Sequence, residues 1–280
     1  MNKKIFSENC NLSSYTTIKV GGVAEYFAEP RSVEELSYLI KWANLNKQRC
    51  QIIGAGSNLL INNIFIKGLV VCTKKLKSLK IEPYSGIVEA EAGVMLPTLS
   101  NSLAKNGLQG GEWAVGIPGT LGGAIYMNAG TGNLSLAKNL ISVKVINNKT
   151  HEKLEIEKKD INFEYRFSSF QRNDLTIISA RLHFEPNGNL EKLIQTTKNN
   201  LKLKTETQPY HQPSFGSVFK NPENNYAAKL IDDMGLKGFK IGGAEISTMH
   251  SNFIINTSSA SSKDIYELIT VIQQKVLQNK

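Results

Sequence analysis

The sequence predicts an α+β protein of two domains, or of three small ones. The chain has 280 residues, of which 41% are hydrophobic, and this is enough to bury a substantial core. Segments with helical periodicity and segments with strand character follow one another along the chain. Glycine clusters at 54–56 and 107–123, which indicates loops where the backbone must approach something closely.

Helices are expected where a start signal precedes an apolar stripe. Ser32 and Glu35 have the spacing of a capping box, and they precede a stripe formed by Leu36, Leu39, Ile40 and Ala43. A second helix is expected over 97–106, because Pro97 suits a first turn and Gly107 suits the position after a helix end. Further helices are expected at 190–204, at 227–234 and from about 262 onward.

Strands are expected in both halves of the chain, at 51–53, 68–73, 86–91, 141–146, 153–157, 175–184 and 252–256. The sequence Pro186-Asn187-Gly188 is a turn signal and a plausible domain boundary. We therefore expect one domain over 1–186, divided into two subdomains near residue 73, and a smaller domain over 187–280.

Charge and cysteine content exclude several classes of function. The formal net charge is +9, but no run of five like charges exists, which favours a small anionic ligand over nucleic acid or a membrane. The three cysteines have no metal-ligand spacing with the four histidines, so no metal site is expected. Free thiols, and the lack of a signal peptide or a long apolar segment, predict a cytoplasmic protein.

Two glycine-rich loops are the first candidates for binding a ligand. Gly54-Ala55-Gly56 follows an expected strand, but Leu59 stands where a dinucleotide fingerprint needs its third glycine, so a Rossmann domain is not expected. Taken alone, this loop could be only a tight turn. The second loop, 116–124, changes the interpretation, because two loops rich in backbone N–H donors suit a diphosphate.

Common nucleotide and hydrolase motifs are missing from the sequence. It contains no G-x-x-x-x-G-K-[ST] loop, no H-E-x-x-H and no G-x-S-x-G elbow. Kinase and hydrolase chemistry are therefore not expected.

Six motifs together resemble the UDP-N-acetylenolpyruvoylglucosamine reductase family in order and in approximate spacing. They are 15–22 (YTTIKVGG), 54–60 (GAGSNLL), 116–130 (GIPGTLGGAIYMNAG), Tyr165-Arg166, 216–222 (GSVFKNP) and 250–253 (HSNF). The resemblance implies a two-part FAD-binding region of the vanillyl-alcohol-oxidase type, followed by a C-terminal substrate domain. It also implies a monomeric enzyme of peptidoglycan synthesis, which reduces UDP-N-acetylglucosamine enolpyruvate with NADPH.

The same resemblance places FAD against the two glycine loops. The matching residues are Gly54, Ala55, Gly56, Ser57, Asn58, Leu59, Gly116, Gly119, Thr120, Gly122, Gly123 and Ala124. No histidine lies in or beside either loop, so FAD is expected to be held noncovalently.

The resemblance also assigns the catalytic roles. Arg166 matches the residue that holds the substrate carboxylate, and Ser217 matches the proton donor. Tyr165, Lys220 and Asn221 are expected to contact the substrate. Glu112 and His250 are expected to be structural, although both lie in or beside the matching motifs.

The sequence departs from the family pattern in two places that matter. Asn63 and Phe65 stand where the family usually has aspartate and glycine, so the turn after the first loop is expected to be built differently. The family also continues into a short strand with a second catalytic glutamate, which nothing up to Lys280 matches. We therefore expect a truncated or impaired reductase, and the alternative is a non-catalytic protein that binds FAD or a UDP-sugar.

Overall fold

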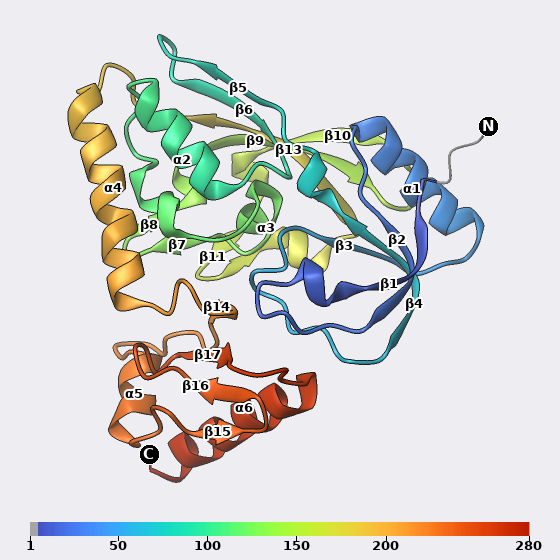
Figure 1. Ribbon diagram of the computed structural model, residues 1–280. Coiled ribbons are helices and arrows are strands. Elements are labelled where there is room, and N and C mark those ends of the chain that lie inside the picture. Colours follow the sequence, from blue (N-terminus) through green and yellow to red (C-terminus); the bar gives the residue numbers. More distant parts are fainter. Residues whose placement is uncertain (1–4, 280) are drawn as a thin grey trace. The chain divides into compact units, whose positions relative to one another are not determined.

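The computed structural model describes residues 5–279, so the expectation about a segment after Lys280 lies outside the described residues (Figure 1). The chain forms two compact units, each made of three segments. Unit 1 contains the described residues up to Asn9, together with Glu25–Ala55 and Lys67–Lys202. Unit 2 contains Cys10–Ala24, Gly56–Ile66 and the described part of Leu203–Lys280.

A four-stranded sheet near the N-terminus lies mostly in unit 1. Its order is β1 (Ser7–Asn11), β2 (Val23–Ala28), β4 (Phe65–Cys72) and β3 (Cys50–Ile53), with β3 and β4 parallel. Helix α1 (Val33–Leu45) packs its predicted stripe into this sheet's core, and all four residues of the stripe are buried. Half of the predicted capping box is present, because the Ser32 hydroxyl accepts the Glu35 N–H at 3.2 Å, whereas the Glu35 carboxylate accepts the Arg31 N–H and not that of Ser32.

A five-stranded antiparallel sheet forms the centre of unit 1. Its order is β10 (Lys153–Glu157), β9 (Leu140–Asn147), β13 (Leu175–His183), β6 (Ile87–Glu91) and β5 (Leu79–Glu82). Helices α2 (Leu96–Lys105) and α3 (Leu121–Tyr126) share one hydrophobic core with this sheet (Figure 1). This core is the largest in the described residues, and it fixes α3, which follows the second glycine loop.

Two short hairpins and one long helix complete this part of the chain. The hairpins are β7 (Gly130–Thr131) with β8 (Leu134–Ser135), and β11 (Phe163–Glu164) with β12 (Phe167–Ser168). Helix α4 (Leu190–Thr207) begins in unit 1 and ends in unit 2. Single 3₁₀ turns occur at Leu12–Tyr15, Thr73–Lys75, Glu112–Gly116, Leu136–Lys138, Lys158–Asp160 and Ser169–Arg172.

Unit 2 is built on a second four-stranded antiparallel sheet. Its order is β14 (Ser214–Ser217), β17 (Phe253–Asn256), β16 (Ala244–Ile246) and β15 (Lys240–Ile241). Helices α5 (Ala227–Asp233) and α6 (Ser262–Gln278) pack on this sheet, and Ile18 and Val20 from the N-terminal part of the chain join the same core. The unit therefore depends on segments that are far apart in the sequence.

Gly56 fixes one of these long-range contacts inside unit 2. Its φ is +64°, and its carbonyl accepts the Thr17 N–H at 3.3 Å. A Cβ built on Gly56 would lie 2.1 Å from the carbonyl oxygen of Tyr15. A side chain is therefore opposed at this position by both the backbone conformation and the available space.

We predict that Gly56→Ala destabilises unit 2 more than Gly235→Ala does. Gly235 is a matched control, because it lies in the same unit with φ +66° and a Cβ there would have nothing within 4 Å. Both variants lose about 1 kcal/mol from left-handed backbone strain, and Gly56→Ala adds a steric cost of about 1–3 kcal/mol. Urea unfolding measures both values, and equal losses would contradict the contact at Gly56.

Candidate functional site: two glycine loops, an arginine turn and a serine strand end

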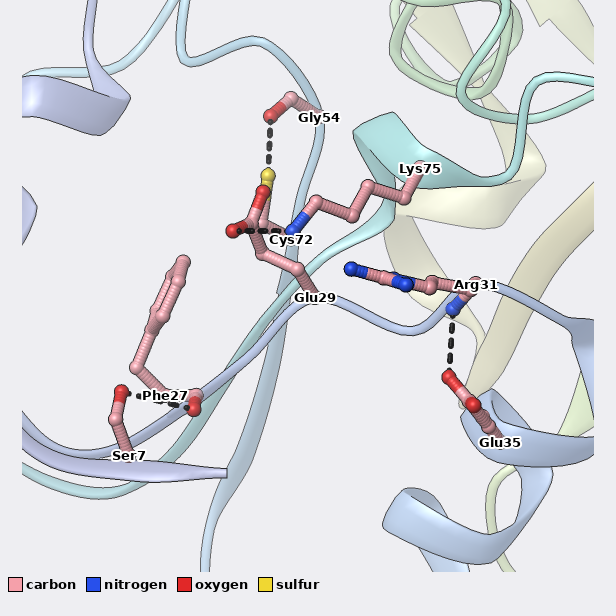
Figure 2. A network of polar contacts seen from close by, with 8 residues as sticks. All are labelled: Ser7, Phe27, Glu29, Arg31, Glu35, Gly54, Cys72 and Lys75. Atoms are coloured by element: carbon pink, nitrogen blue, oxygen red, sulfur yellow. Dashed lines mark hydrogen bonds and ion pairs between the residues drawn. The ribbon is translucent and has the colours of Figure 1, made fainter. Parts of the chain in front are cut away.

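The two glycine loops predicted from the sequence meet inside unit 1. Gly54 directly follows β3, and a Cβ built on it would lie 2.3 Å from Thr120 Oγ1 in the second loop. The Gly54 carbonyl accepts a hydrogen bond from Cys72 Sγ at 3.4 Å (Figure 2). Burial raises the pKa of the Cys72 thiol, which keeps it protonated and able to donate. Gly54 is thus held closely from two sides.

Figure 2 shows a small group of polar contacts in unit 1 that includes Gly54. Lys75 and Glu29 form an ion pair at 3.0 Å, and the Arg31 N–H donates to Glu35 Oε2 at 2.7 Å. The ion pair is partly exposed, so it contributes little to stability. It does connect the turn after β2 with the turn after β4, and Cys72, the last residue of β4, bonds Gly54.

Thr120 organises the second loop. Its side chain is buried, caps α3 and accepts the Gly123 N–H at 3.4 Å. The N–H groups of Leu121 and Gly122 donate to the carbonyls of Val94 and Ala92, both at 2.8 Å. Those two donors are engaged within the protein, so the N–H of Gly122 is not available to a phosphate.

Packing explains why position 122 is a glycine, because a Cβ there would lie 2.9 Å from Ala92 Cβ. Gly123 is exposed, and a Cβ there would lie 3.5 Å from Thr120 Oγ1. A Cβ at Gly54 would thus collide with the Thr120 hydroxyl, whereas one at Gly123 would make only ordinary contact with it. Gly54, Thr120 and Gly123 form a cradle of closely packed backbone, of which Gly123 is exposed. This cradle fits the diphosphate of a bound dinucleotide such as FAD.

The remaining predicted cofactor residues are distributed over both units. Gly119 accepts the Leu96 N–H at 2.9 Å, which fixes the second loop to the start of α2. Gly116 and Ala124 are buried in unit 1, and Ala124 belongs to its core. Ala55 is the last residue of its segment of unit 1. Gly56, Ser57, Asn58 and Leu59 belong to unit 2, where Asn58 and Leu59 are exposed.

Arg166 lies in the turn of the β11–β12 hairpin of unit 1. Its φ is +57°, and its Nη2 donates to the carbonyl of Gly130 at 2.9 Å. Its guanidinium lies 5.0 Å from the centre of the exposed Tyr165 ring. A guanidinium has five N–H donors, so the bond to Gly130 orients the group and leaves donors for a carboxylate.

The turn that carries Arg166 is tied to the end of α3 by side chains to which the sequence analysis assigned no role. Asn128 Nδ2 donates to the Glu164 carbonyl at 2.9 Å. Ser168 Oγ and Gln171 Nε2 donate to the Tyr126 carbonyl at 2.8 and 2.9 Å. Because α3 begins at the second glycine loop, one short helix connects the predicted diphosphate site with the predicted carboxylate site.

Ser217 is the exposed last residue of β14 in unit 2. The residue before it, Gly216, has φ +79°, and a Cβ there would lie 3.9 Å from the carbonyl oxygen of Ser57. Unit 2 therefore brings Ser217 and the second half of the first glycine loop close together.

The predicted substrate residues after Ser217 differ in their surroundings. Lys220 is exposed. The Asn221 side chain accepts the Ala227 N–H at 3.1 Å, which fixes the start of α5. Glu112 accepts the Gly110 N–H with both carboxylate oxygens, at 3.1 and 3.0 Å, so it has the structural contact that the sequence suggested.

Asn63 departs from the family pattern, but it forms hydrogen bonds with two other segments of unit 2. Its N–H donates to Ser262 Oγ at 3.0 Å, and its Nδ2 donates to the Gly21 carbonyl at 3.2 Å. Its Oδ1 accepts the Ser262 N–H. Phe65 is 51% exposed. The turn after the first loop is thus stabilised by an asparagine whose amide bonds two other segments.

Comparisons with known proteins identify the family of this chain. A family model described as "FAD binding domain" matches residues 24–152, and one described as "UDP-N-acetylenolpyruvoylglucosamine reductase, C-terminal domain" matches 208–280. A reductase of that name from Prochlorococcus marinus subsp. pastoris is 72% identical, over 98% of this chain and 93% of the relative. The chain belongs to the UDP-N-acetylenolpyruvoylglucosamine reductase family. A second Prochlorococcus marinus relative of the same name is 48% identical over 99% of the chain and 94% of its own length.

Solved structures support both the family and the fold. The reductase of this family from Thermus caldophilus is 31% identical, with a TM-score of 0.82 over 96% of this chain and 95% of that one. A Phl p 4 variant described as a glucose oxidase matches with a TM-score of 0.51 at 14% identity, over 66% of this chain and 42% of its own, which shows likeness of fold alone. The predicted fold, an FAD-binding region with a C-terminal domain of this family, is confirmed.

Family membership makes the protein an FAD-containing oxidoreductase, as the motifs indicated. Among residues 5–279, no helix is long and apolar enough to cross a membrane.

Proposed function

We propose that the protein reduces UDP-N-acetylglucosamine enolpyruvate to UDP-N-acetylmuramate in peptidoglycan synthesis, as a cytoplasmic monomer that uses NADPH. The observation that carries this proposal is the cradle formed by Gly54, Thr120 and Gly123, together with the family to which the chain belongs. The two loops that contain the twelve residues given above are proposed to hold FAD, with the diphosphate beside Thr120. Gly122 shapes the second loop by packing on Ala92, because its N–H is already bonded. Bound there, FAD would supply hydride transfer between NADPH and the enolpyruvyl carbon distant from the carboxylate.

Arg166 is proposed to bind the substrate carboxylate. Hydride addition leaves negative charge on the carbon next to that carboxylate, and the charge spreads onto the carboxylate oxygens. A planar guanidinium can bond both oxygens and stabilise this charge as it develops. The bond from Nη2 to Gly130 and the contact with Tyr165 support this role, because they restrict how the guanidinium can rotate.

Ser217 is proposed to give its Oγ proton to the carbon next to the carboxylate, which completes the reduction. Solvent then restores the proton on Oγ. A serine hydroxyl is a weak acid, so the transfer needs positive charge nearby, and the exposed Lys220 follows three residues later. Tyr165, Lys220 and Asn221 are proposed to contact the UDP-sugar.

We predict that Ser217→Ala separates the two half-reactions. Reduction of bound FAD by NADPH should stay within about twofold of the wild type, because the proton transfer comes later. Reoxidation by the enolpyruvyl substrate should slow on the order of 10²- to 10⁴-fold. Anaerobic stopped-flow absorbance of the flavin measures both rates.

Ser214→Ala is the matched control for this experiment, because Ser214 lies on the same strand and pairs with Ile255. It should leave both rates near those of the wild type. If Ser217→Ala slowed both half-reactions equally, Ser217 would lose its assigned role.

We predict that Arg166→Lys lowers kcat/KM by about 10²-fold or more, roughly 3 kcal/mol. A lysine keeps the charge but cannot bond both carboxylate oxygens in one plane. Arg172→Lys is the control, because Arg172 is exposed in the next turn of the chain. Its guanidinium lies 4.7 Å from the ring centre of Phe167. Steady-state kinetics should show little change for Arg172→Lys, and an equally mild Arg166→Lys would exclude bidentate binding.

A further inference from the structure

The regular pairing of β14 ends in an irregular step at Ser217. Ser214 pairs with Ile255, whereas Ser217 pairs with Phe253, so β14 has one residue more than β17 over this interval. Gly216, with φ +79°, lies within the resulting bulge. A bulge re-aims the side chain beside it and interrupts the ladder. The direction of Ser217 therefore depends on what holds the backbone immediately after it.

Asn252 holds that backbone at three points. Its carbonyl accepts the Val218 N–H at 2.9 Å. Its side-chain Oδ1 accepts the Phe219 N–H, and its Nδ2 donates to the Phe219 carbonyl, both at 2.9 Å. The amide side chain thus replaces a strand partner for Phe219, where the β14–β17 ladder has ended.

Only a side chain with the length and the two polar groups of asparagine can make this pair of bonds. Aspartate would keep the acceptor for the Phe219 N–H, but it would place a second oxygen against the Phe219 carbonyl. Asn252 is 4% exposed, so water has little access to compensate for a lost bond.

The segment around Asn252 is itself fixed. The Asn252 N–H donates to His250 Nδ1 at 3.3 Å, and Ser251 Oγ donates to the Ala228 carbonyl at 2.5 Å. The His250 ring lies 4.8 Å from the Phe253 ring in an edge-on arrangement. Burial lowers the pKa of His250, and Lys204 and Lys237 lower it further, which favours the neutral ring that can accept at Nδ1.

We propose that Asn252 is a positioning residue, which sets the orientation of Ser217 by holding Val218 and Phe219. This inference rests on the proposed role of Ser217 as the proton donor. It assigns Asn252 no contact with substrate or FAD. Its effect on the reaction is therefore exerted through Ser217 alone.

The test is a double-mutant cycle with Asn252→Asp and Ser217→Ala, measured on the FAD-loaded protein by stopped flow. Asn252→Asp should slow reoxidation by the enolpyruvyl substrate about 10- to 100-fold, as expected for a misplaced reacting group. Reduction of FAD by NADPH should not change. In the Ser217→Ala background, Asn252→Asp should slow reoxidation no further, because the group it positions is already absent.

Asn256→Asp is the matched control for the loss of a structural amide. Asn256 ends β17, the strand that Asn252 immediately precedes, and its side chain also makes two backbone bonds, to Ile18 and Ala260, both at 3.0 Å. It should lower the stability of unit 2 and leave the ratio of the two half-reaction rates unchanged. If Asn252→Asp does not fold, Asn252→Ser, which is too short to bond both groups of Phe219, is measured with the same expectations.

Three results would overturn the inference in distinguishable ways. Equal slowing by Asn252→Asp in both backgrounds would show that Asn252 acts independently of Ser217. A wild-type reoxidation rate in Asn252→Asp, with Ser217→Ala slow, would refute the inference and leave the role of Ser217 intact. A wild-type rate in Ser217→Ala would refute both.

Discussion

The close approach of Gly54 to Thr120 is the contact on which the candidate site of unit 1 depends. It requires that position 54 have no side chain, because a Cβ would lie 2.3 Å from the Thr120 hydroxyl. The same hydroxyl caps α3 through the Gly123 N–H, so the residue after β3 and the start of α3 approach each other at one atom. One loop follows a strand of the four-stranded sheet, and the other precedes a helix that packs on the five-stranded sheet. The two loops meet at Thr120.

Helix α3 connects that contact with the hairpin that carries Arg166. The helix packs into the core of the five-stranded sheet, and its last carbonyl, on Tyr126, accepts bonds from Ser168 and Gln171. Those bonds hold the hairpin turn in which Arg166 has φ +57°. A left-handed backbone at an arginine costs free energy, and it persists because the surrounding bonds determine it.

Asparagine side chains take the place of backbone partners in both units. Asn128 bonds the Glu164 carbonyl near Arg166, and Asn252 bonds both polar groups of Phe219 near Ser217. In each case the side-chain amide forms hydrogen bonds with backbone at a point where regular strand pairing ends. The proposed catalytic residues thus lie on irregular backbone that is nevertheless well held.

Much of this architecture could be predicted because its signals are local. Ser32, the stripe of α1 and Gly107 after α2 are signals within one or two turns of sequence, and the structure confirms the helices they mark. Several strands were missed, among them β2, β5 and β16. Two more have an evident reason, because β1 (SENCN) is mostly exposed and β14 (SFGS) is short and bulged. Neither has the alternation that identifies a strand.

The glycine loops were visible in the sequence because clustered glycines mark places where backbone must approach another group without a Cβ between them. That Gly122 packs on Ala92, and that its N–H is already bonded, depends on a tertiary contact that the sequence does not contain. The same holds for Asn128 and Asn252, whose partners are 36 and 33 residues away.

The most direct measurement of the central claim is the affinity of the apoprotein for FAD in Gly54→Ala, compared with the wild type and with Gly132→Ala. Gly132 lies in unit 1 with φ +55°, and a Cβ there would have nothing within 4 Å, so its replacement tests backbone strain without touching the cradle. Titration followed by flavin fluorescence should show one noncovalent FAD in the wild type and in Gly132→Ala. Gly54→Ala should bind FAD at least about tenfold more weakly, which is about 1.4 kcal/mol. A folded Gly54→Ala protein with wild-type affinity would contradict the account.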